Sequence, residues 1–223
     1  MKRFPAIAIL LASPWVLAQS DISKVNGSVR TEANTSYGEL SSVNGSVHVA
    51  SGVSAKEVET VNGSLQIGDK AQITSASTVN GSIRIGEDVR VAKDIETVSG
   101  RVEVARGSQI DGGIETVNGP ITVNGAQVGG SIESVNGTIT LRESVVKADL
   151  EVTNGDIIVG SGSHVQGDLI VNKTGWFSFG SSPLPTVRIE AGAKVDGKLD
   201  FKREVKLIDE RTAPTATPET VER

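Results

Sequence analysis

The sequence predicts an all-β fold, a single-domain parallel β-helix with turns of about 18 residues and three short strands per turn. The first observation behind this prediction is the phrase Val-Asn-Gly-Ser-Val at residues 25–29, which returns seven times with small changes. Its second residue lies at positions 26, 44, 62, 80, 99, 118, 136 and 154, so the position rises by 18 or 19 at every step. A fixed period of this size indicates a solenoid, in which each repeat packs on its neighbours.

The second observation is that apolar and polar residues alternate in three short runs within each repeat. In the repeat at 79–97, the apolar positions of the three runs are Ile83 and Ile85, Val89 and Val91, and Ile95. Strict alternation over a few residues is typical of half-buried strands. The third observation is composition, because 25 glycines and only 3% aromatic residues suit a narrow core filled by thin layers of valine and isoleucine.

The first residues resemble a secretory signal peptide. Lys2 and Arg3 supply the charged start, residues 4–17 form the apolar stretch, and small residues precede a cut after Ala18. We therefore expect residues 1–18 to be removed and the protein to be exported to the periplasm or cell surface of a bacterium. Apart from this stretch, the sequence contains no run of about 18 apolar residues that would span a membrane. It contains no cysteine, which excludes disulfides and thiolate metal sites.

Charge bears on the expected partners. Removing the signal peptide leaves 20 of the 22 basic residues against 27 acidic ones, a net charge of −7. Nucleic acid is therefore not expected as a partner, because neutralising its phosphates needs clustered lysines and arginines.

The Asn-Gly pairs are expected to form one corner of each turn, since glycine adopts positive φ freely and asparagine tolerates the left-handed conformation. Asparagines stacked in successive turns are expected to form a ladder of amide hydrogen bonds. The ladder positions are Asn26, Asn44, Asn62, Asn80, Asn118, Asn136 and Asn154. Ser99 interrupts the ladder once. The valines before the corners, such as Val61, Val79 and Val98, are expected to point into the core.

A second interpretation treats each Asn-Gly as the two-residue turn of a β-hairpin. A hairpin at residues 99–100 would set Glu96 opposite Glu103 and would place Val98 on a face with charged residues, which is unfavourable. The sequence therefore favours the β-helix, with the hairpin array as the alternative.

The repeat domain is expected to cover residues 19–210. The two longer steps of the period are expected to place one extra residue at a corner, near 92–94 and 111–113. The last residues, 211–223, have the composition of a disordered tail.

An aromatic segment at 172–185 interrupts the repeat and carries Trp176, Phe177 and Phe179. We expect this loop either to cover the apolar column as a plug, which the sequence favours, or to bind a sugar or a partner.

Two families share this repeat pattern. The Val-Asn-Gly-Ser-Ile repeats over about 22–171, behind a signal peptide, resemble the putative-adhesin β-strand-repeat proteins, a family of undefined function. The run from Ile189 to Leu199 resembles a turn of the bactofilins, polymer-forming β-helical proteins, and this likeness extends over 157–171 and 187–201. The second resemblance implies self-association.

One row of acidic residues suggests a metal site. Glu96, Glu115, Glu133 and Glu151 occupy the same position in four successive turns, so their carboxylates would stack about 4.8 Å apart. One interpretation is a calcium-binding edge, because Ca²⁺ takes several carboxylate oxygens. The favoured one is a solvated acidic face without a metal, since no calcium-repeat motif is present.

Catalytic residues are harder to find. A polysaccharide hydrolase or lyase would need paired acids, for which the candidates are Asp94, Asp111, Asp149 and Asp168. They do not cluster in the sequence with a cation. His48 and His164 have no metal-ligand spacing and are expected on solvent-facing strand positions.

The sequence therefore predicts a non-enzymatic, exported structural or adhesive protein of the cell envelope. It is expected to self-associate, or to bind a cell-surface polysaccharide or an envelope protein, without a cofactor. The alternative is a carbohydrate-binding or carbohydrate-active β-helix protein.

Overall fold

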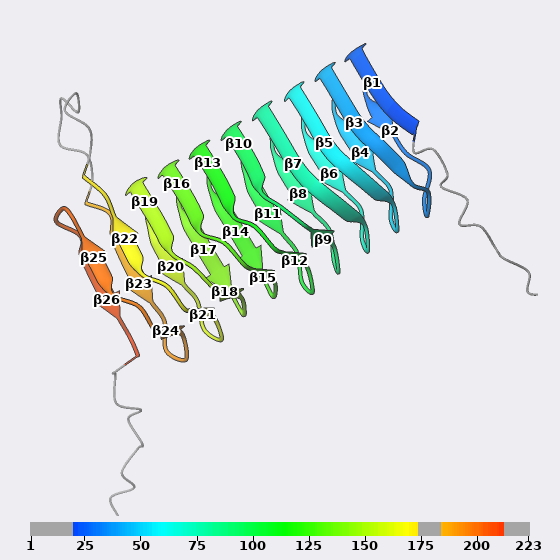
Figure 1. Cartoon of the computed structure of the whole chain (residues 1–223). Coiled ribbons are helices and arrows are strands. Elements are labelled where there is room, and N and C mark those ends of the chain that lie inside the picture. The colour runs from blue at the N-terminus through cyan, green and yellow to red at the C-terminus, as the bar shows by residue number, and fades with distance from the viewer. Residues whose placement is uncertain (1–19, 174–183, 212–223) are drawn as a thin grey trace, which may run out of the picture.

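The chain winds into a parallel β-solenoid of about ten turns, or laps, in the computed structural model, which describes residues 20–173 and 184–211. All secondary structure in these two ranges is β-strand, 26 strands in total. The laps stack into a rod with β1 at one end and β25 and β26 at the other (Figure 1). Every strand pairing joins neighbouring laps in parallel, which confirms the β-helix and excludes the hairpin array.

The strands form three stacks along the rod. The first stack contains β1 (Ser20–Asn26), β3 (Tyr37–Asn44), β5 (Ser54–Asn62), β7 (Gln72–Asn80), β10 (Ile95–Ser99), β13 (Ile114–Asn118), β16 (Ile132–Asn136), β19 (Leu150–Asn154), β22 (Leu169–Val171) and β25 (Leu199–Phe201). The second contains β2 (Val29–Arg30), β4 (Val47–Val49), β6 (Leu65–Ile67), β8 (Ile83–Ile85), β11 (Val102–Val104), β14 (Ile121–Asn124), β17 (Ile139–Arg142), β20 (Ile157–Val159), β23 (Thr186–Ile189) and β26 (Lys206–Asp209). The third contains β9 (Arg90–Val91), β12 (Gln109–Ile110), β15 (Gln127–Val128), β18 (Val145–Val146), β21 (His164–Val165) and β24 (Lys194–Val195).

The early laps have two strands rather than the expected three. The long strand β7 pairs with β9 through its first residues and with β10 through its last residues, so it serves the third and first stacks together. The sequence separation of register partners is 18 for Ile73 and Val91, but 19 for Ala76 and Ile95. The extra residue therefore lies at 92–94, as predicted, and it separates the two strands from this lap onward.

The next lap keeps the longer corner at 111–113, again as predicted. Ile114 is the register partner of Ile95, again at a separation of 19. The separation returns to 18 because the turn that follows Val123 is shorter by one position. Val123 pairs with Val104, a separation of 19, whereas Gln127 pairs with Gln109, a separation of 18.

The core is one column of aliphatic side chains. Residues paired across laps share the same apolar position: Val102, for example, lies between Ile83 and Ile121, and none of the three is exposed to solvent. Each layer covers the apolar face of the layer below, which is how a narrow solenoid with few aromatic residues excludes water.

The valines before the corners do not belong to this column, and the prediction that they point inward is wrong. Val61, Val79 and Val98 are 40%, 41% and 44% exposed. The strand keeps its two-residue alternation up to the corner, so with Ile95 and Thr97 inside, Val98 must lie outside. The parallel stacking of laps does not depend on these valines, because the core column consists of other side chains.

A row of buried hydroxyl groups takes the place expected for the valines. Thr60 and Thr78 are each 4% exposed, and each donates to a glycine carbonyl of the preceding lap, Thr60 to Gly45 at 2.8 Å and Thr78 to Gly63 at 3.1 Å. These hydrogen bonds satisfy the glycine carbonyls at the corner. They also keep the cost of burying the two hydroxyl groups low.

Two corner glycines have the predicted positive φ, Gly27 at 108° and Gly119 at 153°, but most corner glycines are required for another reason. Gly81 has no positive φ, but a Cβ added there would overlap the carbonyl oxygen of Gly63 in the lap before. The ladder asparagines are likewise absent from the left-handed region. At corners such as Gly81, close stacking of laps selects glycine without an unusual dihedral angle.

The predicted asparagine ladder is present. Each amide Nδ2 donates to the Oδ1 of the asparagine one lap earlier, for instance Asn62 to Asn44 and Asn80 to Asn62, both at 3.0 Å. The ladder runs from Asn26 to Asn80 and, beyond the interruption at Ser99, from Asn118 to Asn154.

Filling the gap in the ladder should stabilise the protein. Ser99 lies in register with Asn80 and Asn118, so Ser99→Asn adds up to two amide hydrogen bonds and is expected to raise the unfolding free energy by about 1 kcal/mol. Asn62→Ala removes two such bonds and should lower it by about the same amount. Urea denaturation of both variants checks this prediction. A loss of stability in Ser99→Asn would contradict it.

The interruption of the repeat lies between β22 and β23, where other laps have their Gly corner. Ile157 therefore pairs with Val187, a sequence separation of 30, and stacking then continues. Trp176, Phe177 and Phe179, the signal peptide and residues 212–223 lie outside the described residues. Within the described ranges, no helix is long and apolar enough to cross a membrane.

Candidate functional site

A groove runs along the outer face of the first stack, across the laps from β1 to β13. Its volume is about 530 Å³. One wall is formed by Val43, Val61, Val79, Val98 and Val117. They belong to a longer row of outward valines, exposed except for the half-buried Val117 and called here the valine ridge: Val25, Val43, Val61, Val79, Val98, Val117 and Val135. The other wall is formed by the residues two positions earlier in each strand, from Ser23 to Glu115. This row continues beyond the groove and is called here the glutamate row: Ser23, Ser41, Glu59, Ser77, Glu96, Glu115, Glu133 and Glu151.

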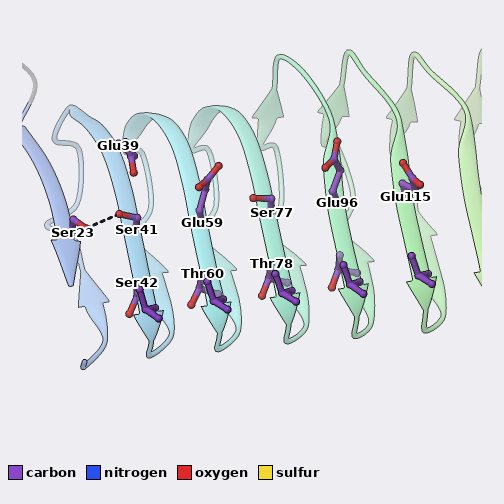
Figure 2. Close-up of a pocket in the computed structure, with 16 residues that line it drawn as sticks. Ser23, Glu39, Ser41, Ser42, Glu59, Thr60, Ser77, Thr78, Glu96 and Glu115 are labelled. Atoms are coloured by element: carbon purple, nitrogen blue, oxygen red, sulfur yellow. Dashed lines mark hydrogen bonds between the residues drawn. The ribbon is translucent and has the colours of Figure 1, made fainter. Parts of the chain in front are cut away.

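Figure 2 shows how the strands position these groups. Glu59, Glu96 and Glu115 extend from the same face of β5, β10 and β13, with Ser77 of β7 between the first two and Glu39 farther from the corner on β3. Ser42, Thr60 and Thr78 form a parallel row nearer the corner. Successive side chains of a strand point to opposite faces. Glu59 and Val61 therefore lie on the outer face, and Thr60 between them lies on the inner face. The first laps carry serine at some positions of the row, and Ser41 donates to Ser23 at 3.0 Å.

The predicted stacking of Glu96, Glu115, Glu133 and Glu151 is present: each is the direct register partner of the next. None of the four forms an ion pair within the part of the chain that the structure describes. Burial raises the pKa of the Glu133 carboxyl, and the nearby charges of Glu151, Glu115 and Asp149 raise it further. The row is therefore a line of mutually repelling carboxylates.

The raised pKa of Glu133 predicts a pH-dependent gain from Glu133→Gln. A folded state that holds its proton more tightly than the unfolded chain loses stability as pH rises from the ordinary pKa of glutamate through the raised value. Removing the charge should therefore stabilise the protein at neutral pH, by about 0.5 kcal/mol or less because solvent screens the row. The gain should disappear below the ordinary pKa of glutamate. Thermal unfolding at pH 7 and pH 4 measures it, and an equal effect at both would contradict it.

The structure gives the calcium-edge interpretation no closed site. Within residues 20–173 and 184–211, no group of three or more histidine or acidic side chains is arranged to hold a metal ion. The glutamates stand in a line instead of converging on one point.

The four aspartates considered as catalytic acids are scattered and have structural contacts. Asp94 accepts the backbone N–H of Gly113 at 2.8 Å, and Asp149 accepts that of Asp168 at 2.7 Å. Asp168 in turn accepts the N–H of Lys198 at 2.7 Å. These carboxylates tie one lap to the next at the corner.

The remaining aspartate candidate and the two histidines lie on strands and turns away from the groove. Asp111 pairs with Arg90 at 2.8 Å. His48 contacts Gln66 and His164 contacts Asp196, 2.7 Å between Nε2 and Oδ2, both on outward strand positions as predicted. None of these residues lines the groove.

Sequence reasoning missed the groove itself. It found the glutamate row but placed the neighbouring valines inside, so it could not see that an apolar row and an acidic row share one face. The two-residue alternation contains the missing signal. In Ile95-Glu96-Thr97-Val98, an inward Ile95 requires Glu96 and Val98 to share the outer face.

With this geometry established, the chain was compared with known proteins. Comparison with protein-family models, with curated proteins and with solved structures gave no match.

Proposed function

We propose that this chain is a non-enzymatic, exported protein of the bacterial cell envelope with a structural or adhesive role. The observation that carries the proposal is the position of the candidate catalytic aspartates and the hydrogen bonds that they accept. A glycosidase or lyase needs two carboxylates converging on one bond, whereas Asp94, Asp149 and Asp168 are spread along the rod and accept backbone N–H groups.

The groove supports the same conclusion. Its glutamates lie in a row, and its lining contains no lysine, arginine or histidine. The enzyme alternative therefore lacks the cation expected beside its acids. A regular rod with long even faces suits a protein that presents surface to partners. The resemblance of residues 1–18 to a secretory signal peptide supports a position in the envelope.

The self-association expected from the sequence is not included in this proposal as an end-to-end contact, because of the charges on the last lap. Among the described residues, four lysines lie on or beside the strands of the last lap, β24, β25 and β26: Lys194, Lys198, Lys202 and Lys206. Lysines on an edge strand hinder the addition of another strand. We therefore expect single rods about 43 Å long, from ten laps about 4.8 Å apart, in electron micrographs of the purified chain.

Expression of the full chain in a Gram-negative bacterium tests the envelope role. We expect the protein in the envelope fraction, with mass spectrometry showing a new N-terminus after Ala18. An uncut chain retained in the cytoplasm would overturn export. Release of oligosaccharides from envelope polysaccharides by the purified protein, lost in variants of its acids, would overturn the non-enzymatic role.

A further inference from the structure

The groove of the first stack pairs an apolar wall with an acidic one. Its lining includes Val43, Val61, Val79 and Val98 on one side. On the other side it includes the four glutamates Glu39, Glu59, Glu96 and Glu115. A contiguous apolar strip on a soluble protein, with polar groups along its edge, is typical of an interaction surface.

The acidic wall is not neutralised by any basic side chain of residues 20–173 and 184–211. The arginines of the neighbouring faces have other partners, Arg84 with Glu103 at 2.9 Å and Arg106 with Glu143 at 2.8 Å. Among the described residues, no basic side chain forms an ion pair with the groove glutamates. Stacked like charges repel each other, so positive charges supplied by a partner would lower the energy of this face.

We propose that the valine ridge and the glutamate row together bind a basic amphipathic helix of another protein, laid along the rod. Apolar side chains of the helix would pack against the valine ridge, and lysines or arginines on its flank would pair with the glutamate row. The inference does not rest on the envelope role, because the same contacts would form in any compartment.

The spacing of the rows favours a helix over an extended strand. Laps lie about 4.8 Å apart, and side chains on one face of a helix return about every 5.4 Å. Side chains on one face of a strand return about every 6.8 Å, and lose register with the laps within two or three steps. The ridge from Val25 to Val135 is about 29 Å long, the length of a helix of about 19 residues.

Charge also decides against two other occupants. An anionic membrane surface would be repelled by the glutamate row. The second stack of another copy offers no basic row among the described residues, because its outward positions mix Arg84 and Glu103 with uncharged Gln66 and Thr122. The lysines of the last lap lie on one lap at the end of the rod, whereas the valine ridge crosses seven laps.

The test uses a labelled synthetic peptide with leucines on one helical face and lysines along its flank, about 20 residues long so that its helix matches the ridge. We expect it to bind the chain without residues 1–18 saturably in fluorescence anisotropy, and more weakly as salt rises. The triple variant Glu59→Gln, Glu96→Gln, Glu115→Gln should bind about tenfold more weakly, since three exposed ion pairs are lost. Val61→Ser, Val79→Ser, Val98→Ser should weaken binding at least as much.

The matched control removes three acids from other faces, with Glu32→Gln, Glu87→Gln and Glu204→Gln, and should leave affinity unchanged. A second peptide of the same composition, with its leucines scattered, should bind at least tenfold more weakly. Absence of peptide binding, equal binding of both peptides, or equal effects of the two glutamine triples would overturn the inference. Displacement of the peptide by a neutral polysaccharide would assign the groove to sugar and overturn it as well. Circular dichroism confirms that each variant keeps its strands.

Discussion

Gly81→Ala is expected to lower the unfolding free energy by about 3 kcal/mol, the upper part of the usual range for forcing extra atoms into a packed site. The added Cβ would overlap the carbonyl oxygen of Gly63 and would lie 3.1 Å from the backbone nitrogen of Ser64. Both neighbouring atoms belong to the backbone of the preceding lap. They cannot move aside as the end of a flexible side chain would. Urea denaturation, followed by circular dichroism, measures the loss.

Gly27→Ala is the matched control because Gly27 is the same corner of the first described lap. A Cβ there has no neighbour within 4 Å, but φ is +108°. This variant should lose only the cost of the backbone strain, about 1 kcal/mol. Equal losses at the two positions would show that lap-to-lap contact does not select the corner glycine.

The architecture was readable from the sequence because a solenoid is close to one-dimensional. A constant period puts equivalent residues directly above one another, so the ladder of Asn44, Asn62 and Asn80 follows once the laps are known to be parallel. The extra residue at 92–94 could be placed for the same reason, since an insertion must leave the strands at a corner.

The groove could not be predicted from the sequence, because it depends on whether the last valine of each strand, such as Val98, points into the core or to solvent. We expected the corner to rotate Val98 inward, but the corner begins only after Val98, and the strand alternation holds to that point. Moving the bend by one residue sends a side chain to the opposite face. The sequence contained this information in Thr97, whose small polar side chain fits the buried corner where it bonds Gly81 O at 3.2 Å.

A pair of Val→Thr substitutions on the two sides of one corner tests this assignment of inside and outside. Threonine keeps the shape and the strand preference of valine and changes only its polarity. Val102 is fully buried between Ile83 and Ile121, where a hydroxyl has only aliphatic register neighbours, so Val102→Thr should cost about 2 kcal/mol. Val98 is 44% exposed, so Val98→Thr should change stability by less than about 0.5 kcal/mol. Similar losses at both positions would mean that Val98 does contribute to the core, and that the valine ridge is not a free surface. The same Val98→Thr protein links this result to the binding proposal, because a substitution neutral for folding must still weaken a helix that packs on the ridge.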